Sequence, residues 1–148
     1  MRVEKDFKEF IELLNKNKVK YLVVGGFAFA YHAKPRFTKD IDFFVEVSRE
    51  NSIRIIDTLS QFGFGKINLD KGDFLEPDQI IQFGNPPMRI DIITTISGLD
   101  FKTAWENRVE GRYGDFPCFF ISKDDLIRNK KASGRRQDLA DIELLERM

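Results

Sequence analysis

The stretch Asp40-Ile41-Asp42-Phe43-Phe44-Val45-Glu46-Val47 decides how this chain is interpreted. Ile41, Phe43, Val45 and Val47 alternate with Asp40, Asp42, Phe44 and Glu46, and a period of two predicts a β-strand over residues 40–47. Side chains two residues apart on a strand project from the same face, roughly 6 to 7 Å apart. Two carboxylates placed in this way can share a hard divalent cation, and they repel each other without one.

A glycine pair lies upstream of this acidic strand. Lys18 to Val24 is typical of a buried strand, Gly25-Gly26 of a tight turn, and Phe27 to Tyr31 of the start of a helix. Glycine allows backbone N–H groups to approach a ligand closely, and the first N–H groups of a helix carry partial positive charge. The unit therefore suits a phosphate, although a turn that simply needs glycine explains the pair equally well.

A third carboxylate lies downstream in Arg89-Ile90-Asp91-Ile92-Ile93. The apolar neighbours predict a strand, and a carboxylate in such a run is costly to bury unless it has a partner. That partner could be the same cation. An exposed position beside Arg89 on an edge strand is the alternative.

The remaining patterns predict the α+β class with a mixed sheet in one domain over residues 1–148. Its catalytic core is expected at about 18–121 and its C-terminal helices at about 122–148. The expected elements are an amphipathic helix carrying Val3, Phe7, Phe10, Ile11 and Leu14, a helix from Ser48 to about Phe62, strands at Gln79 to Phe83, Arg89 to Thr94 and Phe116 to Ile121, a helix at Leu99 to Val109, and two helices around Gly134.

Composition excludes several classes of protein. With 42% apolar and 32% charged residues, the 148-residue chain resembles an ordinary globular domain. Its formal net charge of zero argues against a wholly basic polyanion-binding surface, so any contact with nucleic acid must be local. The single Cys118 excludes an internal disulfide, and neither a signal peptide nor a membrane span is predicted, so we expect a cytoplasmic location.

Taken in order, Val24-Gly25-Gly26, Asp40-Ile41-Asp42-Phe43 and Ile90-Asp91-Ile92 resemble the motif of the DNA polymerase β-like nucleotidyltransferase superfamily. That motif is an apolar residue, Gly, then Gly or Ser, followed by Asp-apolar-Asp-apolar and later by apolar-Asp-apolar. Many members carry Ser where this chain has Gly26, so backbone N–H groups must bind phosphate there.

Two further segments are similar to bacterial AbiEii-type nucleotidyltransferases, known from abortive-infection and toxin-antitoxin systems. They are Gly25-Gly26-Phe27-Ala28 and the run from Arg36 to Phe44. The run from Leu126 to Leu145 is similar too, with Lys131, Arg135 and Asp138 at positions where such proteins often carry Lys, Arg and Asp on paired helices.

The resemblance implies a polymerase β-like fold with a C-terminal helical pair. The implied reaction transfers a nucleoside monophosphate from a nucleoside triphosphate such as ATP to an acceptor hydroxyl. Two Mg²⁺ ions, or Mn²⁺ in their place, would be held by Asp40, Asp42 and Asp91, and Asp91 would also act as general base. Nucleotide binding is expected at Gly25, Gly26, Arg36, Lys39 and Lys131, although a solvated basic loop explains Arg36 and Lys39 equally well.

The resemblance does not identify the acceptor, which could be an RNA end such as that of tRNA, a partner protein or a small molecule. A cognate toxin or antitoxin is a further partner that it suggests. Two other functions stay open at this point. One is a catalytically idle, nucleotide-binding or antitoxin-like regulatory protein of the same fold, and the other is an interaction module whose acidic residues are surface decoration.

Overall fold

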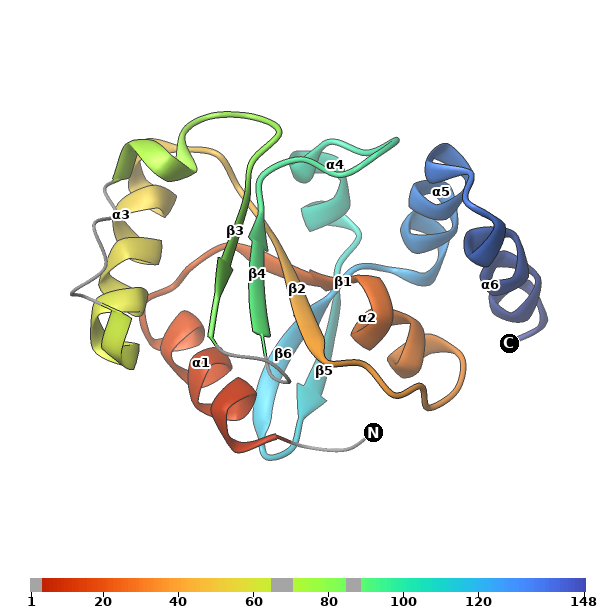
Figure 1. Cartoon of the computed structure of the whole chain (residues 1–148), viewed down its shortest axis with the longest axis horizontal. Coiled ribbons are helices and arrows are strands. Elements are labelled where there is room, and N and C mark those ends of the chain that lie inside the picture. Colours follow the sequence, from red (N-terminus) through yellow and green to blue (C-terminus); the bar gives the residue numbers. More distant parts are fainter. Residues whose placement is uncertain (1–3, 65–70, 85–88) are drawn as a thin grey trace.

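The fold is known from a computed structural model, which describes residues 4–64, 71–84 and 89–148. Six strands form one mixed sheet in the order β3-β4-β2-β1-β6-β5 (Figure 1). They are β1 (Tyr21–Val24), β2 (Asp40–Val45), β3 (Ile80–Phe83), β4 (Arg89–Ile93), β5 (Val109–Tyr113) and β6 (Phe116–Phe120). β2 runs parallel to β4 and antiparallel to β1, β1 runs parallel to β6, and β3 and β5 are antiparallel edge strands.

Six α-helices accompany the sheet in the described part of the chain, namely α1 (Lys5–Lys16), α2 (Gly25–His32), α3 (Arg49–Leu59), α4 (Phe101–Glu106), α5 (Lys123–Ser133) and α6 (Arg136–Arg147). Short π and 3₁₀ turns occupy Ser60–Phe64 and Lys71–Phe74. Ser48 and Ser122 begin α3 and α5 because their hydroxyls accept hydrogen bonds from backbone N–H groups in the first turn. Gly134 ends α5 in the left-handed conformation, with φ of 67°.

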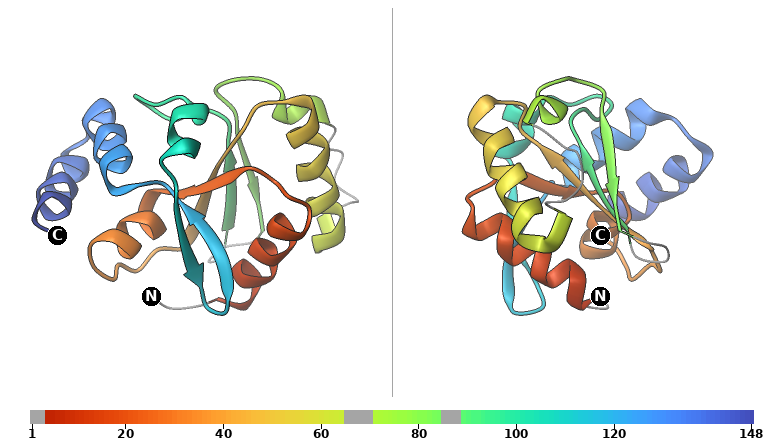
Figure 2. Two further views of the ribbon diagram at one scale, coloured as in Figure 1. Left: turned by 180° about the vertical axis from the view of Figure 1, so that it is seen from behind. Right: turned by 60° about the vertical axis from the view of Figure 1, so that its left-hand side comes forward.

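The alternation of side chains along the strands builds a core on each face of the sheet. Tyr21, Val23, Ile41 and Phe43 pack with α1 and α3 on one face. On the other face, Leu22, Val24 and Phe44 pack with α2, α4, α5 and α6. Figure 2 shows α1 and α3 on one side of the sheet and the α5–α6 pair on the other. The predicted α+β class with a mixed sheet and a C-terminal helical pair is confirmed.

Several predicted boundaries are wrong. The first strand starts at Tyr21 and not at Lys18, because Lys18 adopts a positive φ of 57° in the turn after α1. The predicted helix from Leu99 to Val109 ends at Glu106, and β5 follows it. β5 escaped prediction because Glu110, Gly111 and Arg112 have weak strand propensity, and pairing with β6 holds this segment in a hairpin.

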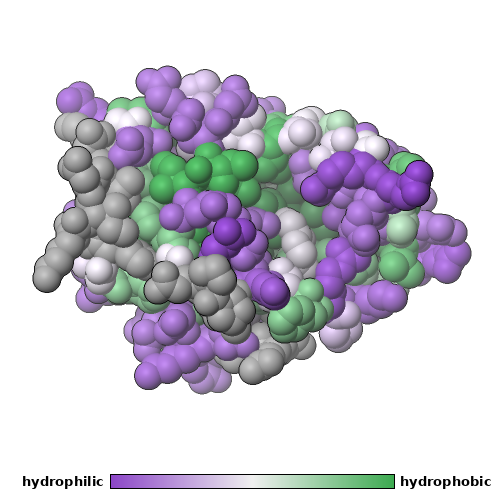
Figure 3. Space-filling model, viewed as in Figure 1, coloured by the Kyte–Doolittle hydropathy of each residue, from purple (hydrophilic) through white to green (hydrophobic). Residues whose placement is uncertain are grey.

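The surface differs from one region to another. Figure 3 shows an apolar patch over β3 and β4 and a mostly hydrophilic surface over the C-terminal helices. Ile80, on the edge strand β3, is 63% exposed. Within the described residues, every helix is too short or too polar to span a bilayer.

Candidate active site

The register between β2 and β4 brings the acidic residues together. Asp42 is the direct neighbour of Asp91 in this parallel pair, and Asp40 is the direct neighbour of Arg89. Neighbours in register project from the same face of a sheet, so Asp40, Asp42 and Asp91 share one face. β4 is an internal strand and Asp91 is only 7% exposed, so the alternative of an exposed residue on an edge strand is wrong.

Asp42 and Asp91 form a closely interacting carboxylate pair. The pKa of Asp42 is raised to about 7, first by burial and then by the charge of Asp91, a hydrogen bond with Asp91 and the charge of Asp40, while Arg89 lowers it. Oδ1 of Asp91 is buried and has no hydrogen-bond partner among the described residues. A protein rarely leaves a buried carboxylate oxygen unpaired, so this atom indicates a ligand.

Asp40 is held differently from the other two carboxylates. Nε and Nη2 of Arg89 donate hydrogen bonds of 3.2 and 2.9 Å to the two carboxylate oxygens of Asp40. This bidentate pair draws the Asp40 carboxylate toward Arg89. No group of three acidic, His or Cys side chains that could hold a metal ion is found in residues 4–64, 71–84 and 89–148. Sequence reasoning missed this role of Arg89, which the matched patterns Asp40-Ile41-Asp42 and Arg89-Ile90-Asp91 could have revealed.

These residues fit a hard divalent cation. Mg²⁺ takes oxygen ligands and usually only one or two carboxylates from a protein. Asp42 and Asp91 provide two carboxylates side by side, and one of them has a buried oxygen with no hydrogen-bond partner among the described residues. A cation would relieve their repulsion. Asp40 would become a further ligand if its pairing with Arg89 opened.

The glycine turn directly adjoins the carboxylate pair. Gly25 has a φ of 66°, and a Cβ at this position would collide with the carboxylate of Asp42. Only glycine therefore fits between β1 and β2 here. Val24, the N-cap residue of α2, has no side-chain acceptor for the first N–H groups of the helix, which stay available to an anion.

Thr38 contributes a hydroxyl beside the second glycine. A Cβ at Gly26 would lie 3.2 Å from Oγ1 of Thr38, and this hydroxyl donates a hydrogen bond of 3.1 Å to the carbonyl of Asp40. The turn therefore has a side-chain hydroxyl close by although Gly26 replaces Ser. Sequence reasoning missed it, because the contact depends on how the loop before β2 folds back onto α2.

Of the three predicted nucleotide-binding cations, Arg36 and Lys131 have acidic partners on α6, and Lys39 directly precedes the acidic strand β2. Arg36 stacks 3.9 Å from the ring centre of Phe29 and donates two hydrogen bonds to Asp141. Lys39 is exposed just before β2, and its carbonyl accepts a hydrogen bond from the backbone of Arg89. Lys131 has a side chain that is 61% exposed, and it lies 3.7 Å from Glu146.

The buried cation of the C-terminal helices is the preceding residue, Lys130. Its ammonium group lies 2.9 Å from Asp141 and 3.5 Å from Asp138, and Asp138 also pairs with Arg135. Burial opposes ionisation of Asp141, but hydrogen bonds from Arg36, Lys130 and Gln137 lower its pKa to about 2. This ion network fastens the loop that leads into β2 to the α5–α6 pair.

Comparison with known families identifies the class of protein. Residues 2–146 match the model of a family whose description reads nucleotidyltransferase of unknown function (DUF6036). The chain belongs to this family. The family is one of nucleotidyltransferases, so the predicted enzyme class is confirmed.

A solved structure supports the fold of this nucleotidyltransferase. The lincosamide antibiotic adenylyltransferase LnuA, in its lincomycin-bound crystal structure, superposes with a TM-score of 0.57 at 18% identity. The match covers 97% of this chain and 96% of that one. A likeness at this identity concerns the fold, and the predicted polymerase β-like architecture agrees with it. No curated protein matches the chain.

Proposed function

We propose that this nucleotidyltransferase transfers a nucleoside monophosphate from a nucleoside triphosphate to an acceptor hydroxyl with the help of a divalent metal. The observation that carries the proposal is the pairing of Asp42 with Asp91 next to Gly25. Such a reaction needs carboxylates that hold a metal next to a turn that can bind phosphate, and this site brings both together. Asp42 and Asp91 would hold the metal, and Asp40 would join them.

The triphosphate would lie against the start of α2. The N–H groups of Gly25, Gly26 and Phe27 stand in the first turn of α2, where no acceptor within the helix is available to them, and they carry its partial positive charge. The hydroxyl of Thr38 stands beside Gly26 and can reorient toward a phosphate oxygen. Lys39, which is exposed just before β2, would meet the outer phosphates.

In the reaction, the acceptor oxygen forms a bond to the α-phosphorus, the bond from this phosphorus to the bridging oxygen breaks, and pyrophosphate leaves. A bound Mg²⁺ would stabilise the charge that develops on the phosphate oxygens and lower the pKa of the acceptor hydroxyl. We propose that Oδ1 of Asp91 takes the proton from the acceptor hydroxyl, because this buried oxygen has no other partner among the described residues.

Arg36 is better suited to positioning than to binding phosphate. Its guanidinium is committed to Asp141 and stacks on Phe29, and Asp141 also binds Lys130. Releasing Arg36 toward a nucleotide would leave the buried Asp141 with one cation fewer. Arg36 would therefore hold the loop that carries Thr38 and Lys39, and Lys131 would remain a surface residue unless the nucleotide reaches α5.

The direct test incubates the protein with Mg²⁺, cell extract and each α-labelled nucleoside triphosphate in turn. Label in an RNA end, in a protein or in a small molecule identifies the acceptor class. Asp42→Asn should abolish labelling, whereas Asp115→Asn, which removes a carboxylate from the exposed β5–β6 turn, should not. Absence of label with every triphosphate and folded protein would contradict the proposal.

The narrower AbiEii-type assignment is a separate proposal that rests on the sequence resemblance alone. It predicts that expression of the chain arrests bacterial growth and that the Asp42→Asn variant does not. Calorimetric nucleotide binding without any turnover would instead favour the idle regulatory protein.

A further inference from the structure

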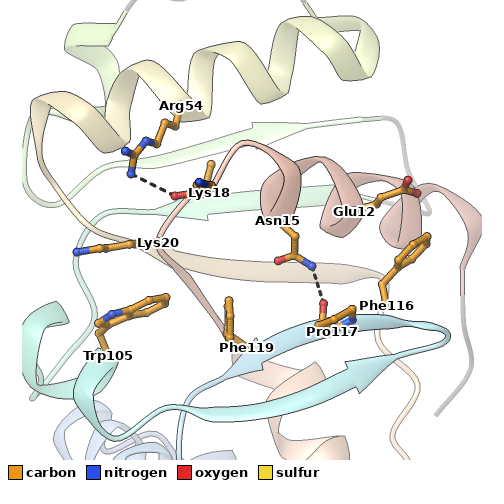
Figure 4. Close-up of a pocket in the computed structure, with 10 residues that line it drawn as sticks. Glu12, Asn15, Lys18, Lys20, Arg54, Trp105, Phe116, Pro117 and Phe119 are labelled. Atoms are coloured by element: carbon orange, nitrogen blue, oxygen red, sulfur yellow. Dashed lines mark hydrogen bonds between the residues drawn. The ribbon is translucent and has the colours of Figure 1, made fainter.

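A pocket of about 520 Å³ lies at the end of β1 opposite to the glycine turn. Val19 and Lys20, which precede β1, line it, whereas Gly25 follows the last residue of the same strand. The walls come from α1, α3, α4 and β6 (Figure 4). Its size lies within the range of small-molecule sites, roughly 300 to 1,000 Å³. The proposed transfer reaction uses none of its residues.

The inner surface of this pocket is mainly apolar. Trp105, Phe116, Pro117 and Phe119 line it together with the buried Val19. Asn15 closes one wall, and both ends of its amide are occupied: Nδ2 donates to the carbonyl of Pro117 and Oδ1 accepts from the hydroxyl of Tyr21. A ligand would therefore meet aromatic faces here and not an unsatisfied amide.

Cations gather along one side of the pocket. Lys18, Lys20 and Arg54 contribute to its lining, and Figure 4 shows Arg54 pointing toward Lys18. Arg54 donates a hydrogen bond of 3.3 Å to the carbonyl of Lys18, but neither side chain forms an ion pair with an acidic residue in the described part of the chain. Lys20 lies 3.5 Å from Glu46 and is partly exposed.

One acidic residue, Glu12, also lines the pocket, and it lies at the far end from Lys20 and Trp105 (Figure 4). The pocket is thus polarised, with Lys18 and Arg54 at one end and an aromatic floor leading away from them. This distribution complements a molecule that has an acidic head and a flat apolar body.

We propose that this pocket binds an amphipathic organic anion, with its acidic group at Lys18 and Arg54 and its apolar body on Trp105 and Phe119. The site is distinct from the nucleotide site, since the whole length of β1 separates the two. A neutral hydrophobic molecule would lack the acidic half of this complementarity.

Trp105 provides a direct readout because it is the single tryptophan of the chain. Anilinonaphthalene sulfonate, an aromatic anion, serves as the probe, and the neutral N-phenylnaphthylamine is its uncharged counterpart. The sulfonate should quench Trp105 fluorescence saturably with one site per chain. The neutral compound should bind about tenfold more weakly, because it forgoes the charge-assisted contacts.

Charge variants locate the acidic head. Lys18→Asn, in which asparagine tolerates the positive φ, and Arg54→Gln should each weaken sulfonate binding by about tenfold and leave the neutral compound unaffected. Lys16→Gln removes an exposed charge from α1 outside the pocket and should change neither. Circular dichroism confirms that each variant is folded.

Independence from the nucleotide site is tested in the same assay. Saturating nucleoside triphosphate with Mg²⁺ should not displace the probe, and Asp42→Asn should bind it normally. Displacement by the triphosphate, equal affinity for both probes, or no quenching up to about 1 mM probe would overturn the proposal. Each of these results leaves nucleotidyl transfer itself untouched.

Discussion

The charge on Asp42 should cost the metal-free protein stability, and removing it by Asp42→Asn should return that stability. The folded protein raises the pKa of this carboxyl from 3.8 to about 7, chiefly by burial and then by Asp91. The folded state thus holds this proton more tightly than the unfolded state does. The associated stability is present at low pH and is lost as the pH rises from near 4 to above 7.

The magnitude follows from about 1.4 kcal/mol per pH unit in that window. Between about pH 4.5 and 7.5, the wild type should lose about 3 kcal/mol relative to Asp42→Asn, which has no titrating group at this position. For a chain of this length, about 3 kcal/mol corresponds to roughly 6 to 12 °C in melting temperature. The difference between the two proteins cancels the contributions of groups that do not interact with Asp42, such as His32, whose pKa is lowered by burial.

The assay is thermal and urea unfolding of both proteins with EDTA across this pH range. Addition of Mg²⁺ and nucleotide at pH 7.5 should then stabilise the wild type more than the variant, because a ligand that binds only the folded state raises its melting temperature. A stability difference that stays flat with pH would refute the reasoning, as would an Asp42→Asn variant that is less stable than the wild type at every pH.

Three further outcomes are expected. Asp141→Ala leaves the cations of Arg36 and Lys130 without their shared partner, so it should lower the free energy of unfolding by about 3 to 5 kcal/mol in urea titrations. The control Asp115→Ala removes an exposed pair with Lys8 and should change this free energy by less than about 1 kcal/mol. Gly25→Ala should abolish transfer, because the added methyl group collides with the carboxylate of Asp42. Gly63 also has a positive φ but open space around it, so Gly63→Ala should lose some stability and retain activity. The Cys118 thiol, whose pKa burial raises to about 12, should resist a thiol reagent at pH 8 until urea unfolds the chain, and rapid labelling of the folded protein would contradict its burial.

Local patterns predicted most of the elements, because period-two and period-3.6 hydrophobicity report directly which face of a segment is buried. β2, the glycine turn and the helix pair around Gly134 were all visible in this way. β5 was not, because Val109 to Tyr113 carries Glu, Gly and Arg and forms a strand only through its pairing with β6.

The sequence by itself also showed that two glycines and three acidic residues follow one another in the order typical of nucleotidyltransferases. Only the tertiary structure decided that Asp91 adjoins Asp42, because the parallel register of β2 and β4 joins segments 49 residues apart. Likewise, the choice of Lys130 over Lys131 as the buried cation depends on packing, since adjacent residues on a helix point about 100° apart. Arg36 finds Asp141 for the same reason: such partners are set by how elements pack, and no local period encodes them.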